Sequence, residues 1–428
     1  MTSSSILAGI RSRQITGGRV NPRRHLLQIG AHWLVYVALL GAVPFLVLGL
    51  AGIHPNVLLY DFKGGLYDAG VAILHGRSPY QPGFLAHQAA IMHAGGIAIG
   101  ETVGKTFSIP VYPAPANVAI VPLSLLPLWL AGAIYTLASI AALVQAVWLL
   151  GVRDWRCFAL ALLSWPFIYG LYLGALGPFL LLGVAVVWRY RDRVWAPAIA
   201  IASIVVAKIF PWPVAAWLLM TRRWKAFALM VAIGLLTTFG AWALIGFHGI
   251  AQYPQMLSDV SFIQERRAVS LVAVLLAAGC SPTVASVLAL LGAGVLLAGA
   301  WHVLRRPDGQ RRALALAVIA ALTGTPIVWD HYMVLLFVPI ALISPAFSAL
   351  WLIPLATPVI VTTSVLLVPM GSHASAGAPD TLRTAAVWLA FEAFLAIRVA
   401  FPEHLAAFRA RARGEHRLAV SAATHTFV

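Results

Sequence analysis

The chain has 428 residues, of which 61% are hydrophobic and only 10% are charged, and its formal net charge is +16. This composition offers too little polar surface for a soluble domain, so the sequence indicates an integral membrane protein. The alternating segments of a membrane β-barrel are absent from the sequence. The two cysteines, Cys157 and Cys280, lie in or beside apolar segments and predict neither a disulfide framework nor a CxxC metal site.

The positive charge lies in short clusters between apolar segments. Most of the 29 Lys and Arg residues belong to the clusters Arg11–Arg24, Arg153/Arg156, Arg189–Arg193, Arg222–Lys225, Arg305–Arg312 and Arg398–Arg417. Cationic loops of membrane proteins usually face the cytoplasm, so the clusters predict which loops are cytoplasmic. Their short, scattered placement argues against a nucleic-acid partner. The basic N-terminus lacks a small-residue cleavage site after a short apolar stretch, so we expect the first apolar segment to be a retained helix.

Placing every basic cluster in the cytoplasm predicts an all-α, polytopic transmembrane bundle with about twelve crossings and both termini inside. Residues 1–30 form a basic cytoplasmic segment, residues 31–400 the transmembrane domain, and residues 401–428 a basic cytoplasmic tail. The first helix, at 31–52, runs outward. It leads into a long Gly- and Pro-rich loop at 53–115, which lies outside the membrane.

The following helices are expected to be broken at prolines and glycines. Pro122 and Pro127 divide one long apolar segment into a short entering helix and a crossing at about 128–150. Two pairs of half-length helices come next, split at Gly174–Pro178 and at Lys208–Pro213, and we expect them to be buried among other helices. A second outer loop lies at 248–267, and the remaining predicted crossings are 225–247, 282–304, 313–327, 329–345, 348–369 and 382–400.

The stretch Val57–Tyr80 interleaves acids, bases and aromatics at the start of the first outer loop. The whole chain has only 13 acidic residues, and Asp61 lies at an apolar-to-polar junction near the membrane surface. It is a candidate catalytic carboxylate or, alternatively, the N-cap of a helix over Phe62–Leu74. Asp68, inside that helix, is a candidate partner of Lys63 or part of a solvated face.

Three further cations are expected on the outer side, each with two interpretations. Arg77 either compensates the C-terminal dipole of the helix before it or binds substrate. Lys208, close to Pro211 and Pro213, either snorkels to the membrane surface or points into a cavity that the broken backbone opens. Arg266 either anchors the second outer loop at the surface or belongs to a site.

A second polar group follows the breaker Thr323–Pro326 and consists of Trp329, Asp330, His331 and Tyr332. A lone histidine in apolar surroundings is usually a satisfied core residue. Here an acid and two aromatics accompany it at the start of a predicted helix, on the same side of the membrane as the first outer loop. We therefore favour a site over a structural role.

The sequence contains no GxxxxGK[ST], HExxH or GxSxG motif, no Cys/His cluster and no Asp-x-Asp pair. No cofactor is expected, and no paired acids require a metal. A lone carboxylate among cations suits attack by a hydroxyl on an anomeric carbon that carries a phosphate. The carboxylate takes the hydroxyl proton, and the cations hold the departing phosphate. A polyprenyl-phosphate sugar is the donor that brings such a phosphate to the outer membrane surface.

Four local patterns are notable together: Asp61-Phe62 with Tyr67, Ala69-Gly70, Gly76 and Ser78-Pro79-Tyr80; Tyr112-Pro113 before the Pro-broken run; Lys208 with Pro211; and Pro326 with Trp329, His331 and Tyr332. They resemble glycosyltransferase family 87, the polyprenol-phosphate-mannose-dependent mannosyltransferases of the GT-C membrane superfamily. The resemblance covers roughly residues 30–400.

The resemblance implies that Asp61 is the catalytic base, and that Lys208 and His331 lie near the donor phosphate. We add Arg266 as a third candidate phosphate ligand. The other expected substrate-binding residues are Tyr80, Tyr112, Trp329, Tyr332, Lys63, Asp68 and Arg77. The predicted partners are membrane lipid, a polyprenyl-phosphate sugar donor, and a lipid or glycan acceptor at the outer face of a bacterial inner membrane.

The chain departs from the family pattern at two places. The usual Gly-Gln-x-Asn reads Gly174-Ala175-Leu176-Gly177 here, and Asn-Gln-Ser reads Ala268-Val269-Ser270. Two alternatives to an inverting glycosyltransferase remain open: a transporter or flippase of lipid-linked saccharides, and a membrane assembly factor without a reaction. A transporter predicts charged residues along a path to both faces.

Overall fold

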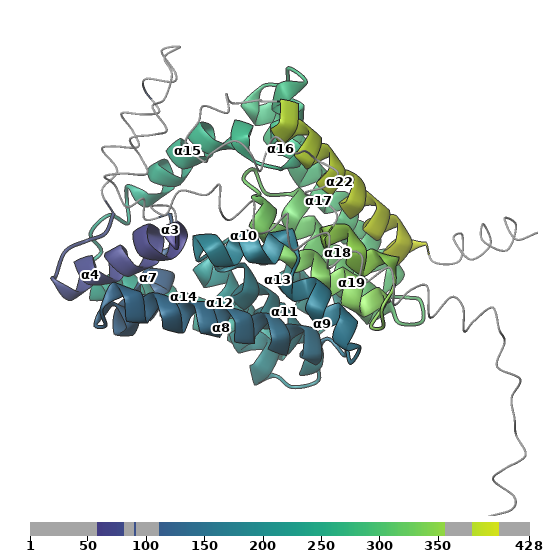
Figure 1. Cartoon of the computed structure of the whole chain (residues 1–428), viewed down its shortest axis with the longest axis horizontal. Helices are drawn as coiled ribbons and strands as arrows, with labels where there is room; N and C mark the ends of the chain where they lie inside the picture. Colours follow the sequence, from purple (N-terminus) through teal and green to yellow (C-terminus); the bar gives the residue numbers. More distant parts are fainter. Residues whose placement is uncertain (1–57, 81–89, 91–110, 356–378, 402–428) are drawn as a thin grey trace, which may run out of the picture.

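We describe a computed structural model of the chain, which defines residues 58–80, 90, 111–355 and 379–401 (Figure 1). Every regular element in these residues is helical, and none of them is a strand. Three helices are long and apolar enough to cross a membrane, namely α8 (Leu128–Leu149), α14 (Trp224–Leu244) and α17 (Pro282–Val303). A fourth candidate span is the pair α9 (Trp155–Leu162) and α10 (Trp165–Leu173), which is bent by 49°.

The helical membrane class predicted from composition is therefore confirmed. The described residues hold three or four candidate spans, and the total of about twelve crossings stays a prediction. The expected segment 1–30, the helix at 31–52, most of the loop at 53–115, and all of the expected tail 401–428 except Phe401 lie outside the described residues.

The other helical elements are shorter. In chain order they are α3 (Tyr60–Phe62), the π-helix η2 (Lys63–Tyr67), α4 (Asp68–Leu74), α7 (Ala114–Ser124), α11 (Gly177–Arg189), α12 (Trp195–Ala207), α13 (Trp212–Met220), α15 (Tyr253–Gln264), the 3₁₀ turn η3 (Glu265–Arg267), α16 (Leu271–Ala277), α18 (Gly309–Thr323), the 3₁₀-helix η4 (Asp330–Leu336), α19 (Phe337–Ile343), the 3₁₀ turn η5 (Ala349–Leu352) and α22 (Pro379–Ala400).

The predicted helix breaks in the first half of the chain are present. Pro127 is the N-cap of α8, whereas Pro122 lies inside α7, so only Pro127 marks the break between these two helices. Gly174 ends α10 with a left-handed backbone (φ 70°), and Lys208 separates α12 from α13 with an extended backbone. A further break before α10 was not predicted; Pro166 occupies the first turn there, where its missing N–H costs no helical hydrogen bond.

The second half differs from the prediction in three places. The second outer loop contains the helix α15 and the turn η3 instead of irregular chain alone. The single helix predicted at 329–345 is divided into η4 and α19. Pro339 supplies the physical reason, because in the first turn of α19 it has no N–H for the carbonyl of Leu335. The crossing predicted at 348–369 begins with η5, and its remainder lies outside the described residues.

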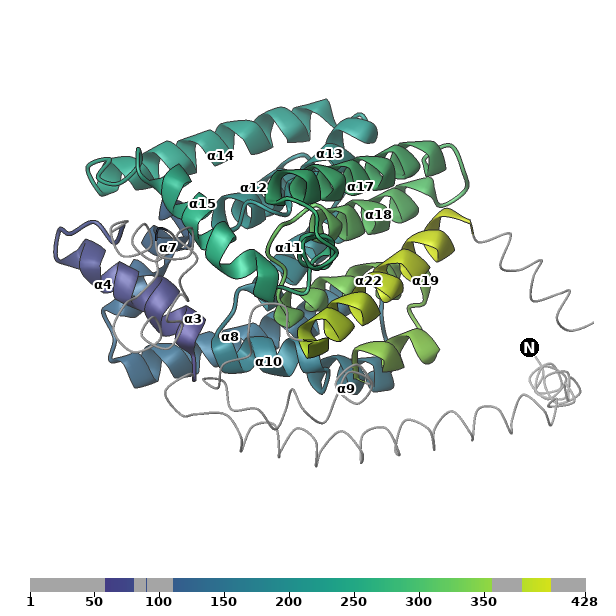
Figure 2. The same cartoon turned by 90° about the horizontal axis from the view of Figure 1, so that it is seen from above.

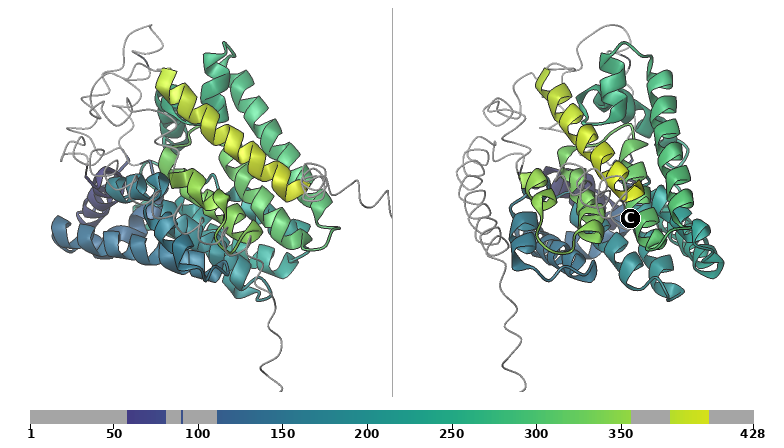
Figure 3. Two further views of the ribbon diagram at one scale, coloured as in Figure 1. Left: turned by 45° about the vertical axis from the view of Figure 1, so that its right-hand side comes forward. Right: turned by 90° about the vertical axis from the view of Figure 1, so that its right-hand side faces the viewer.

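Helix α18 is the centre of the bundle and lies among α13, α17, α19 and α22 (Figures 2 and 3). Every residue from Ala313 to Leu322 is buried, and alanine at half of these positions lets the neighbouring helices approach closely. The outer helices behave differently: Leu236 of α14 and Val295 of α17 are 75% and 71% exposed. Apolar side chains this exposed belong against lipid, which agrees with the candidate spans.

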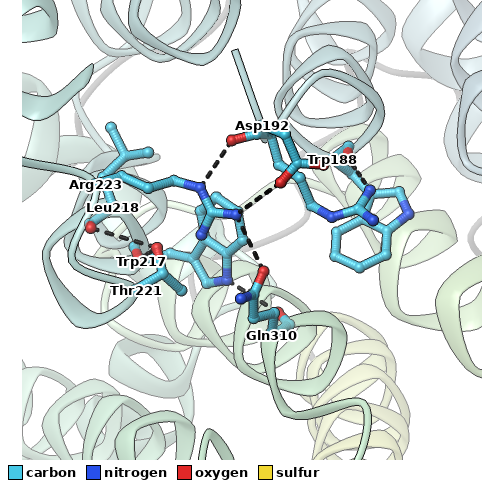
Figure 4. Close-up of polar contacts among 8 residues, drawn as sticks. Trp188, Asp192, Trp217, Leu218, Thr221, Arg223 and Gln310 are labelled. Carbon is cyan, nitrogen blue, oxygen red and sulfur yellow. Dashed lines mark hydrogen bonds and ion pairs between the residues drawn. The ribbon is translucent and has the colours of Figure 1, made fainter. Parts of the chain in front are cut away.

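Arg223 joins three elements at one end of the bundle (Figure 4). Its Nε donates to the carbonyl of Arg191 at 2.8 Å, and one Nη donates to Gln310 Oε1 at 3.1 Å and contacts Asp192 at 3.4 Å. The guanidinium lies 4.8 Å from the ring centre of Trp217, whose indole donates to the carbonyl of Gln310. The α11–α12 turn, the end of α13 and the start of α18 are thus held together.

We expect Arg223→Met to destabilise the protein by about 1–3 kcal/mol, because three acceptors lose a charged donor. A lower midpoint of thermal unfolding in neutral detergent would report this loss. Arg305→Met is the matched control, since Arg305 is an exposed cation in the neighbouring turn between α17 and α18. Equal midpoints for the two variants would contradict the role of Arg223.

Candidate functional site

The start of α3 fixes the position of Asp61. Leu59 is the N-cap residue, with a left-handed backbone (φ 57°), and its N–H donates to the carbonyl of Tyr172 at 2.7 Å. A Cβ on Gly174 would lie 2.6 Å from Cβ of Phe62, so only glycine allows α3 to approach the end of α10 this closely. Asp61 makes no capping hydrogen bond, so the N-cap alternative is wrong.

The residues after Asp61 form a π-helix, Lys63–Tyr67, whose apolar side packs into the protein. Phe62 is fully buried and its ring centre lies 4.4 Å from that of Tyr135 on α8. A Cβ on Gly65 would lie 2.8 Å from the ring of Tyr112, so the backbone and this ring are in close contact. Single π-turns occur often at functional sites because they re-aim neighbouring side chains.

Lys208 points inward between two aromatic rings. Its Nζ lies 4.5 Å from the ring centres of both Tyr112 and Tyr332. This geometry excludes the snorkelling alternative, and no carboxylate among the described residues forms an ion pair with the ammonium group. Burial raises the pKa of Asp61 to about 6, and the positive charge of Lys208 opposes that rise. The two residues therefore share one electrostatic environment, although they lie far apart in the chain.

His331 is 2% exposed and lies next to this pair. Its ring centre is 4.3 Å from that of Tyr332 and 5.9 Å from that of Tyr169. Neither ring nitrogen has a hydrogen-bond partner among the described residues. A Cβ on Gly170 would lie 3.1 Å from Cβ of His331, and one on Gly177 only 3.0 Å from its carbonyl oxygen. The glycine at 177, one of the departures from the family pattern, thus has a packing reason.

Asp330 anchors the segment that carries His331. Its carboxylate accepts a hydrogen bond from the indole of Trp388 at 2.8 Å and another from the indole of Trp165. Trp165 in turn stacks flat on Tyr169, with ring centres 5.3 Å apart and an interplanar angle of 7°. Helices α10 and α22 therefore both bind the start of η4. Trp388 was not predicted, because one tryptophan in an apolar helix gives no local signal for such a contact.

Tyr80 supports the backbone of Tyr112. The Tyr80 hydroxyl donates to the carbonyl of Tyr112 at 3.0 Å, and its ring stacks on Trp242 at 4.8 Å. Asn117, which is fully buried, donates to the Tyr80 hydroxyl at 3.2 Å and to the Tyr112 carbonyl at 3.3 Å. Tyr80 and the unpredicted Asn117 thus hold the backbone of an aromatic residue that contacts the lysine.

Several predicted site residues lie apart from this group. Lys63 forms an ion pair with Asp68 at 3.1 Å, with both side chains accessible to solvent, which confirms that alternative. Arg77 and Arg266 are exposed, and Trp329 is half-buried against the main apolar core. No contact recorded among the described residues joins these five side chains to Asp61, Lys208 or His331.

The end of the second outer loop docks beside the segment that leads to His331. The N–H of Val269 donates to the carbonyl of Val328 at 2.7 Å, and Ser270 Oγ donates to the carbonyl of Pro326 at 2.7 Å. These residues belong to Ala268-Val269-Ser270, the second departure from the family pattern. Their interactions run through the backbone and the serine hydroxyl, so this docking does not require the Asn and Gln of the usual sequence.

The fold and the site define an integral membrane protein in which α3, the α12–α13 break and η4 bring a carboxylate, a lysine and a histidine together. The chain belongs to glycosyltransferase family 87, whose family model matches residues 111–328, about half of its length. This confirms the predicted family, and membership implies glycosyltransferase activity. No curated protein and no solved structure matches the chain. Lys208 lies within the matched residues, whereas Asp61 and His331 lie outside them.

We expect Trp388→Phe to lower stability by about 1–3 kcal/mol, because the buried carboxylate of Asp330 loses one of its two indole donors. The midpoint of thermal unfolding in detergent measures the loss. Trp301→Phe is the control, since Trp301 lies on α17 and is 51% exposed. A Trp388→Phe midpoint equal to that of wild type would show that the indole donor contributes nothing.

Proposed function

We propose that this family 87 enzyme transfers a hexosyl group, with mannose the first candidate, from a polyprenyl-phosphate sugar to a hydroxyl of a lipid or glycan, with inversion at the anomeric carbon. The observation that carries the proposal is that Asp61 and Lys208 interact electrostatically without forming an ion pair. The carboxylate of Asp61 has no hydrogen bond among the described residues, and the nearby ammonium group contacts aromatic rings and no carboxylate.

Asp61 acts as the general base in this proposal. Its carboxylate accepts the proton of the acceptor hydroxyl while the hydroxyl oxygen bonds to the anomeric carbon. The bond from that carbon to the phosphate oxygen breaks on the opposite face, and polyprenyl phosphate leaves with the electron pair. Phosphate is a weak base and needs no protonation to leave, so one carboxylate suffices where glycosidases use two.

Lys208 and His331 hold the departing phosphate. Lys208 supplies a positive charge that no contacting acid neutralises, and the ring of His331 offers a nitrogen that has no partner among the described residues. Donors fixed in a water-poor site stabilise developing negative charge more strongly than donors in water. Arg266, exposed on η3 in the second outer loop, is proposed as a further positive charge for the phosphate.

We assign the site to the outer face of a bacterial inner membrane. The basic clusters Arg189–Arg193 and Arg222–Lys225 lie at the ends of α11 and α13 that are remote from Lys208 and His331. The positive-inside rule places these clusters in the cytoplasm, which supports an outer position for the site. Membership of a glycosyltransferase family supports covalent transfer over the alternative of a flippase that only moves lipid-linked sugars.

Asp61→Asn is expected to lower the transfer rate by roughly 10²–10⁴-fold, because an amide cannot accept the acceptor proton. The measurement is transfer of labelled mannose from polyprenyl-phosphate mannose to lipid acceptors by purified full-length protein. Donors that carry arabinose, glucose and galactose identify the sugar in parallel.

Asp308→Asn is the matched control for this substitution. Asp308 is an exposed aspartate before α18, at the other end of the bundle, and its left-handed backbone (φ 59°) is one that asparagine tolerates. Transfer by Asp61→Asn at the rate of wild type and of this control would eliminate the general-base role.

The pH dependence of transfer follows from the raised pKa of Asp61, which is about 6. The base must be unprotonated, so kcat/KM is expected to rise with pH through about 6. Burial lowers the pKa of Lys208 to about 8, so kcat/KM is expected to begin to fall again as the pH approaches 8 and the ammonium group loses its proton. Measurement of kcat/KM between about pH 5 and 8 tests this expectation, with thermal unfolding at each pH to separate inactivation from titration. A profile that is flat below pH 7 would contradict the assignment.

A further inference from the structure

Two adjoining turns at the end of the bundle remote from the candidate site form a cationic surface. One is residues 189–193, between α11 and α12, and the other is residues 221–225, between α13 and α14. We call them together the basic double turn. Helix α11 begins at Gly177, against His331, and ends at this surface. Its 13 residues span about 20 Å, so the basic double turn lies well away from the residues proposed for transfer.

The charge of the basic double turn is almost entirely positive. Its only acid is Asp192, and this carboxylate already contacts Arg223. Four exposed cations remain, and none of them has a carboxylate partner among the described residues: Arg189, Arg193, Arg222 and Lys225. The surface therefore carries positive charge that an external anion can neutralise.

The two turns are fixed relative to each other. Arg223 donates to the carbonyl of Arg191 and to Gln310 Oε1, so it ties both turns to the start of α18 (Figure 4). Arg191 donates to the carbonyl of Trp188 at 3.0 Å, and its guanidinium lies 4.3 Å from that ring centre. An anion that binds across the turns thus meets a preformed surface and does not have to order two loops.

The tryptophans beside the basic double turn place it at a membrane surface. Trp195 begins α12 and Trp224 begins α14, and each is 60% exposed. Helix α14 is long and apolar enough to span the membrane, so its first residue lies near the membrane–water interface, where tryptophan is enriched. Arg193, Arg222 and Lys225 lie within two residues of Trp195 or Trp224 in the chain. These cations therefore lie at the level of the lipid headgroups.

We propose that the basic double turn is a binding site for the phosphate headgroups of anionic phospholipids in the leaflet remote from the candidate site. The four exposed cations of the two fixed turns supply positive charge for the headgroup, and the exposed faces of Trp195 and Trp224 supply apolar contact at the acyl-chain boundary. A free phosphate could satisfy the cations but would leave both tryptophans without an apolar partner. This site is independent of the transfer reaction.

The test uses delipidated full-length protein in neutral detergent, titrated with phosphatidylglycerol, phosphatidylcholine or inorganic phosphate. Bound lipid is counted by native mass spectrometry, and the midpoint of thermal unfolding is followed in parallel. Wild type is expected to bind phosphatidylglycerol in preference to phosphatidylcholine. The variant R193Q/R222Q/K225Q is expected to bind phosphatidylglycerol at least roughly tenfold more weakly, with a smaller dependence on salt.

Two further variants make the outcome decisive. R305Q/R311Q/R312Q removes three cations from the α17–α18 connection and the first turn of α18. It is expected to keep tight binding, and the charge-preserving R193K/R222K is expected to bind like wild type. Equal losses in both glutamine triples would assign the effect to overall charge and overturn the site. So would undiminished binding by R193Q/R222Q/K225Q, or equal binding of phosphatidylcholine. Displacement of the lipid by millimolar inorganic phosphate would overturn the choice of a lipid headgroup.

Discussion

The structure around the candidate site depends on one unpaired cation. An ammonium group away from bulk water needs stabilisation, and here Tyr112 and Tyr332 supply it through their ring faces, 4.5 Å from Lys208 Nζ on each side. The two rings lie far apart in the chain, so contacts with Lys208 bring together the residues before α7, the α12–α13 break and η4. Because aromatic faces stabilise a cation without neutralising it, the charge remains available to the carboxylate of Asp61 and to an incoming phosphate.

Each of these aromatic residues has its own support. Tyr80 and Asn117 hold the carbonyl of Tyr112 from one side of the molecule. On the other side, Asp330 secures the start of η4 through indoles of two different helices. The reactive groups thus lie on short or broken elements, while long helices supply the rigidity. Irregular backbone is tolerated in a membrane protein where surrounding protein satisfies its polar groups, which suits the breaks at Gly174 and Lys208.

Local sequence predicted much of this arrangement and missed the rest for definable reasons. Composition identified the membrane class, and Gly174, Pro127 and the stretch from Lys208 to Pro213 marked helix breaks, because these signals act on the backbone where they occur. The 3₁₀ geometry of η4 was missed, since it depends on how Pro339 interrupts a run that is otherwise apolar. Asn117 and Trp388 were missed because their roles arise from partners far away in the chain. Charge alone marked Arg77 and Arg266 in the sequence, and in the described fold both are exposed and neither contacts Asp61, Lys208 or His331.

The residues that match the family model do not include all of the residues that form the candidate site. Residues 111–328 hold Lys208 and Tyr112 but neither Asp61 nor Tyr332, and Trp388 of α22 also lies beyond them. In a fragment cut at these borders, the half-buried Lys208 would lose one of its two aromatic neighbours and its nearest opposing charge. The sequence block that identifies the family is therefore smaller than the unit that has to assemble. Residues on both sides of it must fold with it before Lys208 has the neighbours described here.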